Sequence, residues 1–237
     1  MARAMALDTP AMENPARWAL NLATIVGLAL SGGIAGGQDL GTFLAPYRAA
    51  AERGQAGTLR GMAFTEPRKP QEAATPLAGV TVVVLPPSPR LLGDLEAVKA
   101  HARDSEKNYL GASGEVRKIK DAYELALWRA RSWDLVFTAM SDEGGRFELP
   151  RVPAGAWVLL GWHEQLHPRA PPKIPPRARG AFVLEPLPSG YRAVTYWLIK
   201  LTVAAGEGVG VELHDRNPWL TAVAEEKTQG VIQKQTP

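Results

Sequence analysis

Residues 141–160 read Ser141-Asp-Glu-Gly-Gly-Arg-Phe-Glu-Leu-Pro-Arg-Val-Pro-Ala-Gly-Ala-Trp-Val-Leu-Leu160. The run Asp142–Gly145 predicts a tight turn. After it, charged and apolar residues alternate, so a strand that directs Phe147 into a core should follow. Pro153–Gly155 predicts a second turn, and Trp157 lies in the apolar run behind it. Two short strands joined by a turn are the repeating unit of an antiparallel β-sandwich.

Segments of the same kind recur along the chain. The 237 residues include 23 glycines and 20 prolines, more than an average globular protein has, which favours short strands and turns. None of the predicted strands needs a helical crossover to reach the next, so the sequence predicts a mainly β protein with a sandwich fold. The predicted strands are 59–65, 80–85, 136–140, 146–149, 156–162, 181–184, 194–203 and 209–213.

One segment, residues 91–133, breaks the β pattern. It lacks proline, and its apolar residues recur at steps of three and four, as in an amphipathic helix. The two glycines within 108–114 predict a break between two helices. Two interpretations stay open: a helical pair that covers one face of a sheet, or a surface on which a partner docks.

The N-terminal region predicts export. A twelve-residue, mostly apolar run, Ala19–Leu30, follows Arg3 and Arg17 and precedes a glycine-rich stretch. This order is typical of a secretory signal, so residues 1–37 are expected to be a cleaved signal peptide and the protein to be periplasmic or secreted. The alternative is a retained membrane anchor, with the rest of the chain facing the periplasm.

The remaining chain divides by composition. Residues 38–56 are expected to form a linker or short helix, 57–225 a sandwich with its helical insertion, and 226–237 a flexible tail. Cysteine is absent, which excludes disulfides, thiol catalysis and iron–sulfur clusters. A net charge of +3 is a small imbalance, so no nucleic acid is expected as a partner, and a membrane only through an uncleaved N-terminal segment.

The segment quoted above resembles the hallmark of the carboxypeptidase regulatory-like domains, which have a transthyretin-like (prealbumin-like) fold. That hallmark runs from Thr or Ser through Asp-x-x-Gly and a Phe-containing strand to a Pro-x-Gly turn and an aromatic strand. The matching residues here are Asp142, Gly145, Phe147, Pro153, Gly155 and Trp157. The resemblance covers 58–85 and 136–162, and more loosely 194–214. It implies a transthyretin-like (Ig-like) seven-stranded β-sandwich and an accessory role without catalytic residues.

The motif with the most specific chemistry is His163-Glu-Gln-Leu-His167, a match to H-E-x-x-H. On a helix, two histidines four residues apart bind zinc and the glutamate activates water. Here a predicted strand precedes the motif and Pro168 follows it, which disfavours a helix at His167. No cofactor is therefore expected. Zinc at His163 and His167, with His214 as a third ligand, remains the alternative.

Three other features are candidate binding sites. Exposed tryptophans would suit a protein interface or stacking on sugars, and the candidates are Trp128, Trp133 and Trp219. A polar cluster follows a predicted strand and would either hold the last loop or face a ligand; it comprises Asp215, Arg216 and Asn217. The pattern Gly206-x-Gly208-x-Gly210 resembles part of a nucleotide loop, but it lies between two strands, so no phosphate site is predicted.

The leading hypothesis is a non-enzymatic, exported accessory module of the carboxypeptidase regulatory-like type. It would contact a protein partner through the helical insertion and the loops at the ends of the sandwich. One alternative is a carbohydrate-binding module that uses exposed tryptophans. The other is a zinc-binding protein or metallopeptidase at His163, Glu164 and His167.

Overall fold

The computed structural model describes residues 40–69, 71–169 and 189–226. The predicted signal segment 1–37, the predicted strand 181–184 and nearly all of the predicted tail lie outside these residues. The helices are α1 (Leu40–Glu52), α2 (Pro89–His101) and α3 (Glu106–Arg129), with a short 3-10 turn, η2 (Trp133–Leu135). The strands are β1 (Ala56–Thr65), β2 (Thr75–Pro76), β3 (Thr81–Leu85), β4 (Phe137–Met140), β5 (Arg146–Pro153), β6 (Gly155–Arg169), β7 (Ser189–Val203), β8 (Gly208–His214) and β9 (Leu220–Glu226).

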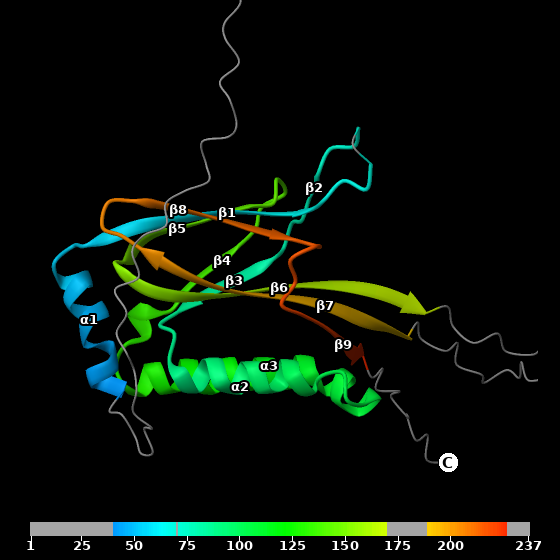
Figure 1. Cartoon of the computed structure of the whole chain (residues 1–237), viewed down its shortest axis with the longest axis horizontal. Helices are drawn as coiled ribbons and strands as arrows, with labels where there is room; N and C mark the ends of the chain where they lie inside the picture. Colours follow the sequence, from blue (N-terminus) through cyan, green and yellow to red (C-terminus); the bar gives the residue numbers. More distant parts are fainter. Residues whose placement is uncertain (1–39, 70, 170–188, 227–237) are drawn as a thin grey trace, which may run out of the picture. The chain divides into compact units, whose positions relative to one another are not determined.

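The strands form two sheets that pack face to face (Figure 1). In the first, sheet A, β1 is central: β8 pairs with one side of it, and β5 and then β2 pair with the other. The second, sheet B, has the order β4-β3-β6-β7-β9. Neighbouring strands are antiparallel except β1 and β8, which are parallel. The predicted mainly β sandwich with a helical insertion is confirmed. Seven strands match the predicted ones within the described residues, and β2 and β9 add to them.

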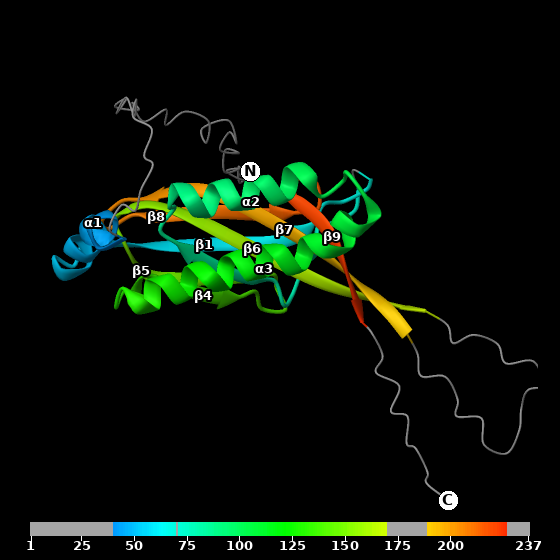
Figure 2. The same ribbon diagram turned by 90° about the horizontal axis from the view of Figure 1, so that it is seen from below.

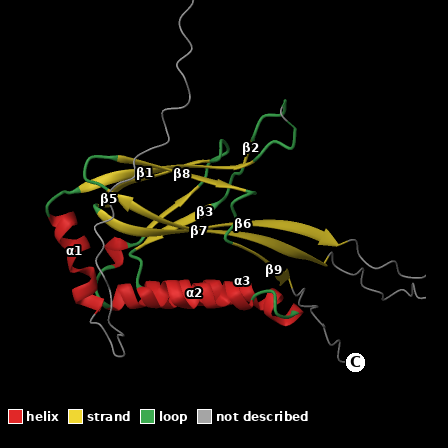
Figure 3. Cartoon of the chain, viewed as in Figure 1, coloured by secondary structure: helices red, strands yellow, loops and turns green. Residues whose placement is uncertain are grey.

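The helical insertion covers the face of sheet B that points away from sheet A (Figures 2 and 3). The apolar residues on its inward side, including Leu91, Val116 and Leu127, are buried. The Tyr123 hydroxyl donates to the Pro86 carbonyl (2.9 Å), and burial raises the pKa of Tyr123 to about 12, which keeps this donor protonated. The interpretation of a helical pair that covers one sheet face is therefore confirmed for the insertion's apolar side.

The break between the two helices lies at 102–105, not at 108–114 as predicted. Ser105 caps α3, because its hydroxyl accepts the Asn108 N–H (3.1 Å). Gly111 and Gly114 lie inside α3 with open space where a side chain would be. Two glycines cost a helix roughly 2 kcal/mol, and burial of the apolar stripe of α3 against sheet B offsets that cost.

The turn at residues 141–146 connects β4 of sheet B to β5 of sheet A. Asp142 Oδ1 accepts the Arg146 N–H (2.8 Å), and the Gly145 N–H donates to the Asp142 carbonyl (2.9 Å). Ser141 is buried; its hydroxyl accepts the Val80 N–H (2.9 Å) and donates to the Leu77 carbonyl (2.6 Å). The turn therefore also fixes the loop that leads into β3.

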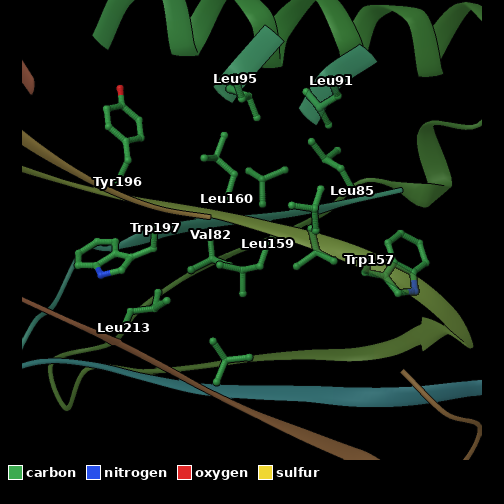
Figure 4. Close-up of a cluster of buried hydrophobic side chains, with 14 of the residues drawn as sticks. Val82, Leu85, Leu91, Leu95, Trp157, Leu159, Leu160, Tyr196, Trp197 and Leu213 are labelled. Atoms are coloured by element: carbon green, nitrogen blue, oxygen red, sulfur yellow. The ribbon is translucent and has the colours of Figure 1, made fainter. Parts of the chain in front are cut away.

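The core lies on both faces of sheet B (Figure 4). Leu160 and Leu85 point toward Leu91 and Leu95 of α2, whereas Leu159 points toward sheet A. The largest buried side chains include Trp157 and Trp197, as well as Tyr196, whose hydroxyl lies 2.8 Å from that of Ser113 in α3. No helix within the described ranges is long and apolar enough to cross a membrane.

Candidate functional site

The H-E-x-x-H motif lies in a strand. β6 continues through it to Arg169, with His163 opposite Thr195 and His167 opposite Tyr191 of β7. Residues four apart on a strand are about 13 Å apart, too far for two imidazoles to bind one ion. The helix that the metallopeptidase alternative requires is not formed. The helix does not form because β6 pairs with β7, and this pairing satisfies the backbone hydrogen bonds of the extended chain.

Glu164, the residue that would activate water in a metallopeptidase, makes ion pairs instead. Its carboxylate binds Arg117 of α3, and its Oε2 lies 3.4 Å from Nη1 of Arg192 in β7. Burial lowers the pKa of His163, although Glu164 opposes this shift. The ring of His167 stacks on Tyr191 at 4.9 Å between centroids. The carboxylate thus ties the helical layer to sheet B.

His214, at the end of β8, contacts the loop after β1. Its Nδ1 is 3.1 Å from Oε1 of Glu66, and its ring stacks on Phe64 at 5.4 Å. Within residues 40–69, 71–169 and 189–226, no group of three His, Asp or Glu side chains could hold a metal ion.

The polar cluster after β8 fixes the loop that follows His214. Arg216 Nη1 lies 2.7 Å from Oε2 of Glu66, and Asp215 Oδ1 accepts the Glu66 N–H (2.8 Å). Asn217 accepts the His214 N–H (2.8 Å) and donates to the Glu212 carbonyl (3.1 Å). All three side chains have intramolecular partners that fix the loop against β1.

After the full chain has been treated with a chelator and the chelator removed, adding zinc is expected to leave its melting temperature unchanged. The strand spacing separates His163 from His167, and His214 contacts Glu66. A ligand bound at 100 times its Kd would add about 2.7 kcal/mol, which scanning calorimetry would detect as a shift of several degrees. A zinc-dependent rise that disappears in His163→Ala would contradict this expectation.

The tryptophans divide into packed and exposed ones. Trp157 and Trp197 are buried in the core. Trp219 is partly buried: its Nε1 donates to Glu96 of α2 (3.1 Å), and Lys99 Nζ lies 5.7 Å from its ring centre. Trp128 and Trp133 are 65% and 66% exposed. These two are the sequence candidates that remain available to a partner.

Trp128 and Trp133 flank the turn at the C-terminal end of α3. Ser132 in that turn is fully buried, and Arg48 of α1 donates to its hydroxyl (3.0 Å) and to the Ala130 carbonyl (2.6 Å). These contacts hold the turn against α1, so both rings project from a fixed backbone.

Leu125, one helical turn before Trp128 and on the same face, is 46% exposed. We call Leu125, Trp128 and Trp133 the tryptophan corner. Exposed charges border it, at Arg129, Arg131 and Asp134. The sequence predicted both tryptophans as exposed candidates but not Leu125, whose only signal was its i,i+3 spacing from Trp128 on the polar side of α3.

A second surface feature is a hollow of about 890 Å³ on the outer face of sheet A, the face away from sheet B. Its floor includes Gly210 of β8, whose missing side chain leaves open space. Its other lining residues include Arg60, Arg146, Asp142, Glu148 and Glu212. This hollow was not predicted from the sequence, in which its only signal was the alternation of glycine with valine at 208–211.

No known protein family matches the chain, and no curated protein matches it. Three solved structures resemble it weakly. One is a Pseudomonas aeruginosa protein provisionally described as carbohydrate-binding (16% identity, 71% of this chain and 94% of that one, TM-score 0.34). Another is the pilus backbone protein of Streptococcus pneumoniae (15%, 65% and 40%, TM-score 0.24). The third is the minor pilin of Streptococcus agalactiae (11%, 74% and 99%, TM-score 0.24). At these TM-scores the likenesses carry no inference about function.

Proposed function

We propose that the chain is an exported, non-enzymatic accessory module of the carboxypeptidase regulatory-like type, and that the tryptophan corner binds a protein partner. The observation that carries the proposal is the exposure of two tryptophans, each about two-thirds accessible, on a fixed turn. Tryptophan and arginine are the residues most enriched at the energetic centres of protein interfaces.

The corner holds the two most exposed large apolar side chains of the helical insertion, Trp128 and Trp133. The apolar stripe of α2 and α3 that faces sheet B is buried, so that stripe offers no docking face. The charges beside the corner are two arginines and one aspartate, Arg129, Arg131 and Asp134. This net positive rim favours a partner whose apolar contact patch is bordered by carboxylates.

Replacing both Trp128 and Trp133 with alanine is expected to weaken partner binding by at least about 100-fold. The melting temperature should change little, because neither ring is buried in the core. Titration calorimetry with the partner recovered by cross-linking from position 133 measures the effect. Leu110→Ala is the matched control, because Leu110 is 39% exposed at the other end of α3. This variant should bind the partner as tightly as the parent chain does.

The same rings would suit stacking on sugars, which is the competing function. Soluble oligosaccharides distinguish the two. Binding of an oligosaccharide that is lost in the double alanine variant, with no protein partner recovered, would replace the proposal by the carbohydrate-binding alternative. Unchanged affinity of the double variant for its protein partner would place the contact elsewhere.

A further inference from the structure

Strand β8 lies at an edge of sheet A. It pairs with β1 on one side, from Thr58 opposite Gly208 to Phe64 opposite His214. No strand of the described part of the chain pairs with its other side. An edge strand presents unpaired N–H and C=O groups, which can pair with another strand.

The free groups belong to Gly208 and Gly210. The Thr58 N–H donates to the Glu207 carbonyl (2.9 Å). In a parallel ladder alternate residues bond to the neighbour, so the backbone groups of Val209 and Val211 point toward β1. Those of Gly208 and Gly210 point away from it. Asn217 caps the far end of this edge through the Glu212 carbonyl and the His214 N–H.

The edge has few of the features that usually prevent pairing. Protected edges carry proline, charged side chains, a bulge or a covering element; β8 has neither proline nor lysine in Gly208-Val-Gly-Val-Glu-Leu-His214, and Glu212 is its one carboxylate. By comparison, the β5 edge of the same sheet contains Pro150 and Pro153. The two glycines leave the outer face beside β8 without side chains, and within the described residues no atom lies within 4 Å of where those side chains would begin.

The charge beside this edge is acidic. The hollow over Gly210 is lined by three carboxylates and two guanidinium groups. One of the two guanidinium groups, that of Arg60, is engaged by Glu148 at 3.3 Å. The exposed Glu212 carboxylate makes no ion pair with any residue in the described ranges. A cationic side chain placed on this face would find an unpaired carboxylate next to the free backbone groups.

We propose that β8 accepts an extended, basic peptide segment of a partner as an additional strand. The peptide's backbone bonds to Gly208 and Gly210. Its inward side chains are apolar and lie beside Val209 and Val211, and an outward lysine or arginine pairs with Glu212. The site is separate from the tryptophan corner, because β8 belongs to sheet A and α3 packs on the far face of sheet B (Figure 1). The proposal therefore stands whether or not that corner binds a partner.

The test uses the isotope-labelled full chain and a synthetic peptide, Thr-Val-Lys-Val-Lys-Val-Thr, blocked at both ends. A matched peptide carries glutamate in place of both lysines. The lysine peptide is expected to bind with a Kd below about 1 mM and to shift the amide resonances of Gly208 and Gly210. The glutamate peptide is expected to bind at least about tenfold more weakly.

Two variants locate the contact. Gly210→Pro removes an outward N–H at an edge, where proline is tolerated in a sheet, and Glu212→Gln removes the charge without changing the backbone. Both are expected to weaken binding of the lysine peptide by about tenfold or more. The control is Glu52→Gln, which removes the same charge at an exposed position of α1. This variant should bind the lysine peptide as tightly as the parent chain does. If Gly210→Pro does not fold, Glu212→Gln alone decides the contact.

Four outcomes would overturn the proposal. Two of them are no binding of the lysine peptide up to about 1 mM, and resonance shifts that lie away from β8. The two peptides binding equally would remove the charge argument that selects this partner. Shifts at Gly208 and Gly210 that depend on protein concentration alone would make a second copy of this chain the occupant.

Discussion

Replacing Gly145 with alanine is expected to lower the free energy of unfolding by about 4 kcal/mol. Gly145 has a φ of +74°, where a side chain is strained. A Cβ there would also lie 2.2 Å from the Ala63 carbonyl oxygen. That oxygen accepts the Leu77 N–H (2.9 Å), and the Gly145 carbonyl accepts the Ala63 N–H (2.7 Å). Because the obstruction is backbone, the turn and β1 must separate to admit a methyl group.

The matched control is Gly144→Ala, one residue earlier in the same turn. A Cβ at Gly144 meets only the Asp142 side chain, at 3.3 Å, so the cost should stay below about 1 kcal/mol. Urea unfolding followed by circular dichroism measures both variants. Equal losses at the two positions would show that general sensitivity of the turn, and not the geometry at Gly145, sets the cost.

Trp157→Ala is expected to destabilise the protein by about 3–5 kcal/mol. The side chain is fully buried, and its Nε1 donates to the Pro153 carbonyl (2.8 Å). Its ring makes edge contacts with Tyr47 of α1 at 5.1 Å and Phe137 of β4 at 5.4 Å. Truncation would leave a cavity among three elements and an unpaired carbonyl.

Trp133→Ala removes the same side chain from an exposed position and is expected to cost less than about 0.5 kcal/mol. The two variants are compared by their urea midpoints. A loss below about 1 kcal/mol for Trp157→Ala would mean that the core closes around the missing ring, contrary to the expected cavity.

The sequence predicted the parts of the fold that depend on local chemistry. Asp142 and Gly145 are turn residues because the backbone there needs an accepting side chain and a positive φ, and both requirements can be read from residue type. The alternation after Arg146 likewise identified β5 and its buried Phe147. The helix caps Ser88 and Ser105 were not predicted from the sequence, although Ser105 marks the actual break between α2 and α3.

The parts that depend on distant neighbours could not be read in this way. His163-Glu-Gln-Leu-His167 has a helical zinc pattern, yet pairing with β7 keeps it extended. The role of Glu164 follows from Arg117, which is 47 residues away along the chain. No local pattern indicates that β8 runs parallel to β1, and that pairing is what leaves Gly208 and Gly210 at an open edge.

Binding of a protein at the tryptophan corner is tested most directly by in-cell photo-cross-linking. A benzophenone amino acid replaces Trp133 in one variant and Leu110 in another, and both are irradiated in producing cells. We expect a discrete protein adduct from position 133 that is absent from position 110, and its loss when Trp128 is also changed to alanine. No protein adduct at position 133, or the same adduct from both positions, would contradict the claim.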